Sequence, residues 1–142
     1  MDGRKVYIDS SVVLRKLLNQ PGAITRWSGW EVVVTSELMQ VEARRTLDRL
    51  RVLGNLSALE LGEALAQLKA HAAGFQVVSV QPAILERASG PLPTPLGTLD
   101  AIHLATALCW MEMNSEPLCL VTHDRQLAVA ARACGLDVQH RP

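Results

Sequence analysis

The segment LDAIHLATAL, residues 99–108, is apolar on nearly every side and predicts a helix buried in the protein core. It carries an aspartate, Asp100, at its beginning. An ionised carboxylate beside a buried helix is unfavourable unless another group compensates its charge, because desolvation favours the neutral acid. The helix is one source of compensation: with Thr98 as N-cap, Asp100 lies in the first turn, where the dipole favours negative charge by about 0.3–1 kcal/mol. A bound cation is the other.

Apolar segments rich in β-branched residues predict strands on both sides of this helix, and helical patterns lie between them. The expected strands span residues 6–8, 31–35, 75–80 and 118–122, with a short fifth strand at 137–138. The expected helices cover residues 12–18, 37–53, 57–71, 82–88, 99–108 and 124–134. Pro21 and Gly22 are expected to end the first helix, and Gly135 the last. The segment 90–97 contains three prolines and two glycines and is expected to be a loop.

Strands that alternate with helices indicate a parallel sheet covered on both faces. We therefore expect an α/β fold, a three-layer α/β/α sandwich with a central, mainly parallel sheet of four to five strands. A chain of 142 residues is long enough for one hydrophobic core, so one domain is expected over residues 1–142.

The composition is that of a compact globular protein, with 49% hydrophobic residues and equal numbers of basic and acidic side chains, 14 of each. A zero net charge identifies no partner, so binding to nucleic acid would need a local basic patch. Cys109, Cys119 and Cys134 lack metal-site spacing and lie in apolar segments, which is typical of small buried residues in a reducing compartment. No apolar run reaches the ~18 residues of a membrane span, so a cytoplasmic protein with no membrane contact is expected.

Acidic residues follow two of the expected strands directly. Asp9 ends the first strand and Asp124 comes two residues after the fourth, at the edge where α/β sheets bind ligands. Each has an alternative role as the N-cap of the next helix. Glu42 lies in the helix SELMQVEARRTLDRL, where its alternative is an exposed ion pair with Arg45.

If the helix of Glu42 faces the strand edge, Glu42 joins Asp9, Asp100 and Asp124 in one site. Four carboxylates so close together need protons or a cation. Oxygen ligands without Cys or His favour a hard cation, Mg²⁺ or Mn²⁺, which suits phosphodiester hydrolysis by an activated water. The pattern thus favours a metal ion as the compensation for Asp100.

These residues lie in four segments that together resemble PIN-domain ribonucleases, and within them the VapC-type toxins of toxin–antitoxin pairs. The segments are YIDSSVVL, SELMQVEARRTLDRL, LGTLDAIHLATAL and LVTHDRQLAVAARACGLDV, and the resemblance spans nearly the whole chain. It implies a PIN-like sandwich with Asp9, Asp100 and Asp124 as metal-site aspartates. Glu42 matches the family's glutamate, which often reaches the metal through water. Ser10 and Thr122 match small hydroxyl residues that orient the carboxylates.

The resemblance also implies an activity and partners: a Mg²⁺- or Mn²⁺-dependent endoribonuclease, a homodimer, that cuts structured RNA and is silenced by a cognate antitoxin. The antitoxin would place an amphipathic segment in an apolar groove and a basic side chain in the acidic site. Basic side chains near the acids are candidates for phosphate contacts, with solvated helix faces as the alternative. They are Arg15, Lys16, Arg44, Arg45 and Arg49.

Other side chains near these motifs have structural explanations. His103 and His123 are expected to be structural histidines, and Trp27, Trp30 and Trp110 are expected to pack in the core or against a partner rather than on bases.

Competing classes lack a required residue. A receiver domain needs an aspartate after the third strand, an Asp-x-Asp phosphatase needs an acid at Ser11, and a dinucleotide-binding enzyme needs glycines after the first strand. The remaining alternative is a catalytically silent PIN-fold module that binds RNA or a partner without cutting.

Overall fold

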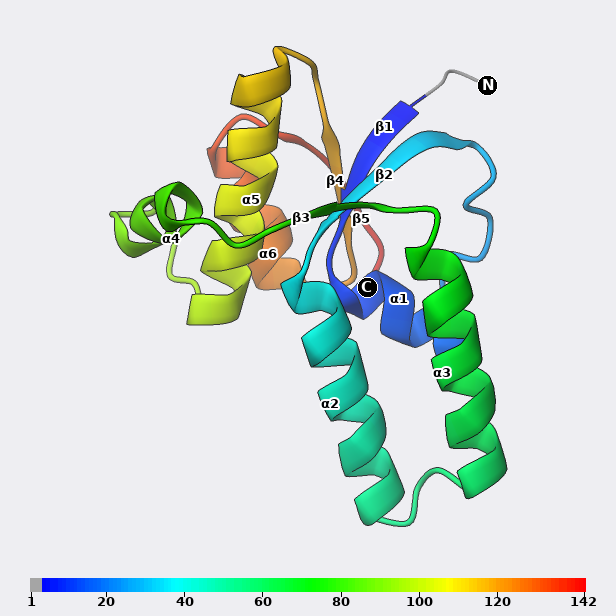
Figure 1. The fold of residues 1–142 in the computed structure, drawn as a ribbon. Helices are drawn as coiled ribbons and strands as arrows, with labels where there is room; N and C mark the ends of the chain where they lie inside the picture. The colour runs from blue at the N-terminus through cyan, green and yellow to red at the C-terminus, as the bar shows by residue number, and fades with distance from the viewer. Residues whose placement is uncertain (1–3) are drawn as a thin grey trace.

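A computed structural model describes residues 4–142 as a five-stranded parallel sheet with helices on both faces (Figure 1). The expected domain also includes residues 1–3, which lie outside the described part. The strands are β1 (Arg4–Ile8), β2 (Trp30–Ser36), β3 (Gln76–Val78), β4 (Cys119–Thr122) and β5 (Asp137–His140). The helices are α1 (Ser10–Leu17), α2 (Leu38–Val52), α3 (Ala58–Ala72), α4 (Pro82–Ser89), α5 (Thr98–Asn114) and α6 (Arg125–Ala133). The expected α/β/α fold with a parallel sheet is confirmed.

The sheet order is β3-β2-β1-β4-β5, so β1 lies at the centre between β2 and β4. Val6 pairs with Val33 of β2 and with Cys119 of β4, and all four strand pairs are parallel. Because the strands are parallel, their carboxyl ends share one edge. This edge receives the residues that follow β1 and β4.

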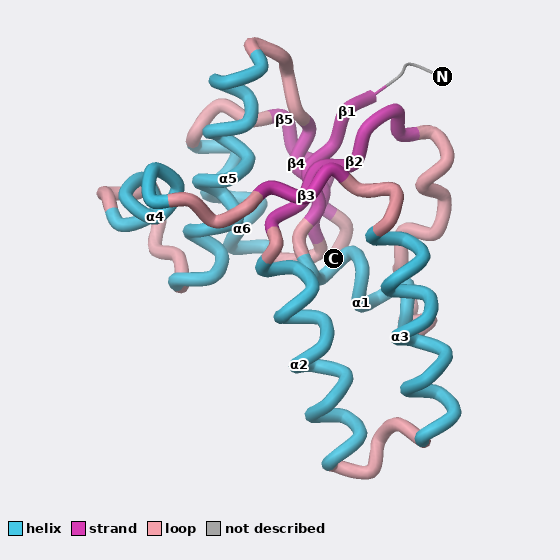
Figure 2. Tube along the Cα trace, viewed as in Figure 1, coloured by secondary structure: helices cyan, strands magenta, loops and turns pink. Residues whose placement is uncertain are grey.

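Alternating side chains of the strands divide the core into two layers. Val6 and Ile8 of β1 pack with α1, α2 and α3 on one face, whereas Tyr7 packs with α5 and α6 on the other. Figure 2 shows the strands between these two groups of helices, with α4 outside α5. Helix α5 is buried on most sides, since every residue from 101 to 107 is buried, as expected for LDAIHLATAL.

Several boundaries differ from the sequence prediction; the largest difference is at the end of α5, which continues to Asn114 rather than ending at residue 108. Helix α1 ends at Leu17, before Pro21, because Asn19 adopts a left-handed backbone with φ of 50°. Strand β3 contains only residues 76–78. Thr98 is the first residue of α5 rather than its N-cap; Gly97 occupies the N-cap and no side chain caps this end.

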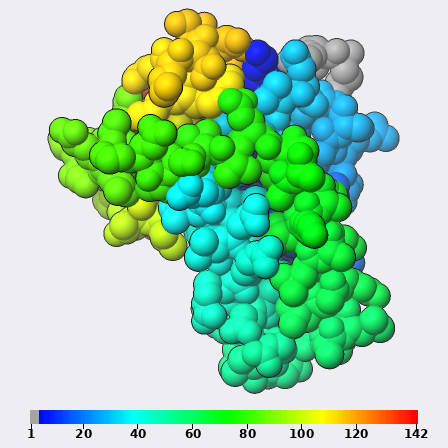
Figure 3. All heavy atoms as spheres, viewed as in Figure 1, coloured from blue at the N-terminus to red at the C-terminus, as the bar shows by residue number. Residues whose placement is uncertain are grey.

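Helices α2 and α3 form a hairpin that projects from the sheet, seen as the lower lobe of the space-filling view in Figure 3. The expected start of α3 at Ser57 is confirmed by a capping box, in which the Ser57 side chain accepts from the Glu60 backbone N–H and Glu60 accepts from Ser57 N–H. The hairpin leaves the first turns of α2 beside the sheet edge.

Two expectations from composition also have structural outcomes. Cys109, Cys119 and Cys134 are free thiols, but each is only partly buried rather than fully buried as expected. Among residues 4–142, no helix is both long enough and apolar enough to cross a membrane.

Candidate active site

The four predicted acids lie on four different elements around the carboxyl edge of the sheet. Asp9 follows β1 and is the N-cap position of α1, while Asp124 follows β4 and is the N-cap of α6. Asp100 lies in the first turn of α5 and Glu42 in the second turn of α2. The parallel sheet thus assembles residues that are more than 110 positions apart in the sequence.

Asp9 is buried, with 4% of its surface exposed, and two hydroxyl groups hold its carboxylate. Ser11 Oγ donates to Asp9 Oδ1 at 2.6 Å, and Thr122 Oγ1 donates to Oδ2 at 3.0 Å. Each hydroxyl oxygen in turn accepts from a backbone N–H, that of His123 for Ser11 (3.0 Å) and that of Asp124 for Thr122 (2.9 Å). Both oxygens of Asp9 are therefore fixed by the backbone of the β4–α6 turn.

This arrangement supports the orienting position expected for Thr122 and moves the other from Ser10 to Ser11. Ser10 forms no hydrogen bond to a carboxylate in the described part of the chain, because it is the first residue of α1 and Ser11 is the one that turns back toward Asp9. The sequence offers two adjacent serines, and only the start of the helix decides between them.

The capping alternative applies to one aspartate and not to the other. Asp124 Oδ1 accepts from the Leu127 backbone N–H at 3.0 Å, so this residue does cap α6. The Asp9 side chain makes no capping hydrogen bond to α1. Asp124 therefore has a structural role as a helix cap, which holds it in position. Asp9 is buried without capping a helix, so helix capping does not explain its burial.

The electrostatics of the site link the acids to one another. Burial is the main cause that raises the pKa of Asp100 to about 6, and the carboxylates of Asp124, Asp9 and Glu42 contribute to the same rise. Burial also raises the pKa of Asp9, with Asp124 adding to it, while the Ser11 and Thr122 hydroxyls oppose the rise. The first turn of α5 alone therefore does not compensate Asp100.

Glu42 does not form the exposed ion pair with Arg45 that was its alternative role. Its Oε1 lies 2.5 Å from His103 Nε2, whereas Arg45 pairs with Asp48 at 3.1 Å. His103 is 1% exposed, and its Nδ1 lies 2.6 Å from the Tyr7 hydroxyl. His103 is thus a buried histidine with both ring nitrogens engaged, which agrees with its expected structural character and connects it to the site.

The donor set fits a hard divalent cation in its chemistry: four carboxylates, no thiolate, and no Lys or Arg among the ion pairs that these acids form within residues 4–142. In the same residues, no three His, Cys, Asp or Glu side chains stand close enough to form a ready-made metal site. Asp124, Asp9 and Glu42 are near enough to raise the pKa of Asp100, but the four carboxylates do not converge, as expected for groups that repel one another.

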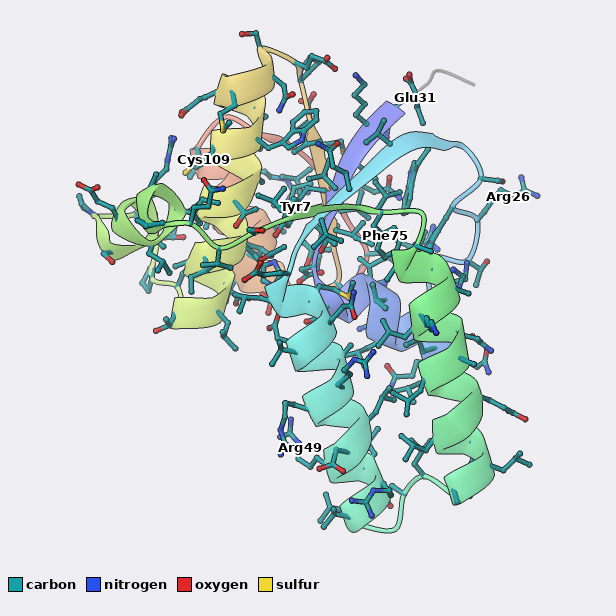
Figure 4. The ribbon with its side chains drawn as sticks, viewed as in Figure 1. Tyr7, Arg26, Glu31, Arg49, Phe75 and Cys109 are labelled. Carbon is teal, nitrogen blue, oxygen red and sulfur yellow. The ribbon has the colours of Figure 1, made fainter. Side chains whose placement is uncertain are left out.

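The expected phosphate contacts are not all near the acids. Arg15 lies on α1 beside His123, whose pKa it lowers, and donates to the Pro142 carbonyl at 2.8 Å. Arg44 is exposed, and Arg45 is engaged by Asp48. Figure 4 shows Arg49 far along α2 from the sheet, pointing away from α3.

The remaining aromatic and basic candidates pack within the protein. Trp27 stacks on Trp30 with ring centroids 6.0 Å apart, and the Lys16 ammonium lies 4.0 Å from the Trp27 ring. Trp110 is 7% exposed, and His123 Nδ1 donates to the Arg141 carbonyl at 2.7 Å. The packing roles expected for the tryptophans and the structural role expected for His123 are confirmed, whereas Lys16, predicted as a phosphate contact, lies on the Trp27 ring.

Sequence reasoning missed Ser11 and Tyr7. The alternation of β1 held a signal for Tyr7: Val6 and Ile8 face one side, so Tyr7 must face α5, where it meets His103. Nothing in the sequence marks its hydroxyl as the partner of a histidine 96 residues away.

Comparison with known proteins agrees with this fold. The sequence matches the PIN domain family over residues 6–133, and it is 31% identical over 137 residues to Ribonuclease VapC46 of Mycobacterium tuberculosis, covering 94% of this chain and 95% of that protein. The chain therefore belongs to the PIN domain family, with a VapC protein among its relatives, which confirms the resemblance in the sequence.

Solved structures share the fold at lower sequence identity. PAE2754 from Pyrobaculum aerophilum superimposes with a TM-score of 0.59 at 20% identity, covering 96% of this chain and 90% of that chain. VapBC2 from Rickettsia felis, solved bound to a DNA fragment from the promoter, gives a TM-score of 0.64 at 10% identity, covering 96% and 98%. At these identities the likeness establishes the fold alone.

Proposed function

We propose that this chain is a Mg²⁺- or Mn²⁺-dependent endoribonuclease that cleaves structured RNA and acts as the toxin of a type II toxin–antitoxin pair. The observation that carries the proposal is the gathering of Asp9, Glu42, Asp100 and Asp124 at one sheet edge, with no Lys or Arg paired to them within residues 4–142, in a PIN-domain chain. The curated relative, a ribonuclease named VapC46, supports the reaction class. We assign this activity to one domain over residues 1–142.

In this proposal Asp9, Asp100 and Asp124 hold the cation, and Glu42 lies at its side. A divalent cation in such a site supplies an activated water molecule and neutralises charge on the phosphodiester. Ser11 and Thr122 keep both oxygens of Asp9 in place as acceptors and oppose the rise in its pKa that burial causes. Asp124 keeps one oxygen on the α6 backbone and leaves the other for the site.

Asp100 has the opposite character. Its pKa of about 6 means that it readily takes up a proton in the metal-free protein. Arg15 on α1 is the candidate among the predicted arginines for holding an RNA phosphate close to the acids.

Cleavage with and without metal tests the reaction. Purified protein is expected to cut RNA with Mg²⁺ or Mn²⁺ and to stop in excess chelator. A matched control is Asp137→Asn, an exposed aspartate at the start of β5, which is expected to keep full activity. Undiminished cleavage in chelator would exclude the metal mechanism, and RNA binding without cleavage in any metal would favour the silent binding module.

The toxin role needs an antitoxin in the same cell, so we place the protein in the cytoplasm as a homodimer bound by a small partner. The Rickettsia felis neighbour is a VapBC complex, which supports this kind of partner. Co-expression with the small proteins encoded beside this chain is expected to yield a co-purifying complex and to relieve growth inhibition. If no neighbouring protein does either, the toxin assignment is wrong even if the RNA is cut.

A further inference from the structure

We propose that His103 is a positioning residue that holds the Glu42 carboxylate at the site, with the position of its ring proton set by Tyr7. The inference rests on the proposed function for its consequence in catalysis, while the hydrogen-bond chain itself is a property of the metal-free protein.

The chain of contacts runs from the core to the site. The Tyr7 hydroxyl lies 2.6 Å from His103 Nδ1, and His103 Nε2 lies 2.5 Å from Glu42 Oε1. Tyr7 is completely buried and His103 is 1% exposed, whereas the Glu42 side chain is 19% exposed. Figure 4 shows Tyr7 between the sheet and α5, the helix that carries His103. The exposed end of this series of hydrogen bonds is the Glu42 carboxylate, and the other end, Tyr7, is fixed in the core.

The direction of the hydrogen bonds follows from the groups that surround Tyr7. A phenol has an ordinary pKa of about 10 and keeps its proton at neutral pH, and the Tyr7 hydroxyl lies in the core within hydrogen-bond distance of His103 Nδ1. Its proton is then available to His103 Nδ1, which accepts. The remaining ring proton lies on Nε2 and is donated to Glu42, so both nitrogens are satisfied by a neutral ring.

The position of His103 in α5 gives this contact its consequence. His103 follows Asp100 by three residues, about one turn of the same helix, so the two side chains come from neighbouring parts of one surface. Glu42 comes from α2, in the other helical layer. The bond from Nε2 to Glu42 therefore fixes a long, flexible carboxylate of one layer relative to an aspartate of the other.

Groups that orient a ligand carboxylate without touching the reacting atoms typically change metal affinity or activity by about tenfold to a hundredfold when they are removed. We expect His103→Leu to lower kcat in this range with little change in KM for RNA. His103→Gln is expected to recover most of the loss, because the glutamine amide carries an N–H donor. His71→Gln, a histidine packed on Trp27 away from the site, is the matched control.

The deciding measurements combine a mutant cycle with a readout in metal-free protein. The double variant His103→Leu with Glu42→Gln is expected to be no less active than Glu42→Gln alone. In ¹⁵N NMR spectra without metal, His103 is expected to carry its proton on Nε2, and Tyr7→Phe, which keeps the ring, is expected to redistribute it. Melting curves identify any variant that does not fold, and His103→Gln and Tyr7→Phe remain as the tests in that case.

Each outcome has a separate meaning. Losses that add in the mutant cycle, or a proton on Nδ1 in wild-type protein, would overturn the positioning role while RNA cleavage stands. If wild-type protein cuts no RNA with either metal, the proposed function fails, and the NMR result still decides whether Tyr7, through His103, orients Glu42.

Discussion

Asp9 and Asp100 are two aspartates of the same candidate site, and the protein treats them in opposite ways. Asp9 is 4% exposed and receives two hydroxyl donors, each anchored by a backbone N–H. Asp100 is half-buried, faces three other carboxylates and has a pKa of about 6. The fold supplies hydrogen-bond donors to the Asp9 carboxylate, whereas the Asp100 carboxylate receives no comparable donor from the residues that the structure describes.

If the site binds a cation as we propose, the difference explains how the site is stable before the cation binds. Hydroxyl donors lower the cost of burying one charge, and a proton removes the other. A protein that compensated all four carboxylates with arginines would gain stability and lose the place where a cation binds. Asp9 is therefore the carboxylate whose position is fixed by hydrogen bonds, and Asp100 is the one that gains or loses a proton near pH 6.

The largest expected effect follows from neutralising either of these two aspartates. Asp9→Asn and Asp100→Asn are each expected to lower RNA cleavage by about a thousandfold, equivalent to ~4 kcal/mol of transition-state stabilisation, because a neutral amide is a poor ligand for a hard cation. Initial rates at saturating Mg²⁺ measure the loss, beside the Asp137→Asn control. Full activity of Asp100→Asn would show that Asp100 only interacts with the dipole of α5 and takes no part in cleavage.

The next effect sharpens the comparison from the side of Asp9. Thr122→Val removes a donor from a buried carboxylate and leaves the Asp124 backbone N–H without its acceptor. The free energy of unfolding is expected to fall by about 1.5–3 kcal/mol, as measured by urea denaturation in chelator. Thr46→Val on α2, outside the site, is the control and is expected to change stability far less.

The corresponding effect at Asp100 has the opposite sign and depends on pH. A carboxyl with a raised pKa in the folded state binds its proton more tightly there than in the unfolded chain. Metal-free protein is therefore expected to gain stability as pH falls from about 7 through 6 toward 4.

Asp100→Asn is then expected to be more stable than wild type at pH 7.5, by about 1 kcal/mol after allowance for solvent screening of a half-exposed group. The difference is expected to vanish near pH 4. Thermal melts in chelator across this range measure it. A less stable Asp100→Asn protein at pH 7.5 would contradict the repulsion among the carboxylates.

The smallest expected effect comes from a third aspartate, Asp48, which has the arginine partners that Asp100 lacks in the part of the chain described. Asp48 on the outer face of α2 pairs with Arg45 and Arg51, and these partners lower its pKa. Asp48→Asn is expected to leave cleavage unchanged and to reduce stability slightly at low salt, with no difference at high salt, because exposed ion pairs are screened. A change in cleavage would show that the arginines of α2 matter to the substrate.

Much of this architecture could be predicted from the sequence because it depends on local patterns. Strand and helix periodicity gave all eleven elements, and Asp9 and Asp124 could be placed at one edge because the strands were expected to be parallel. Helix starts were less predictable where the cap has no side chain of its own, as at Gly97.

The contacts within the site could not be predicted, because they join residues far apart in the chain. The choice of Ser11 over Ser10 depends on where α1 begins, and the pairing of Glu42 with His103 rather than Arg45 depends on how α2 lies against α5. A local ion pair and a distant hydrogen bond compete for the same carboxylate. Only the packing of two helices decides between them.

The central place of β1 in the sheet has a consequence for the order in which the chain becomes active during synthesis. Strand β1 is held between β2 and β4, and the hydroxyl donor from Thr122 reaches Asp9 only after more than a hundred further residues have been added. A nascent chain that ends before β4 therefore holds three of the four acids and no assembled site. The activity that we propose arises only after β4 has been synthesised, which gives the proposed partner time to be present first.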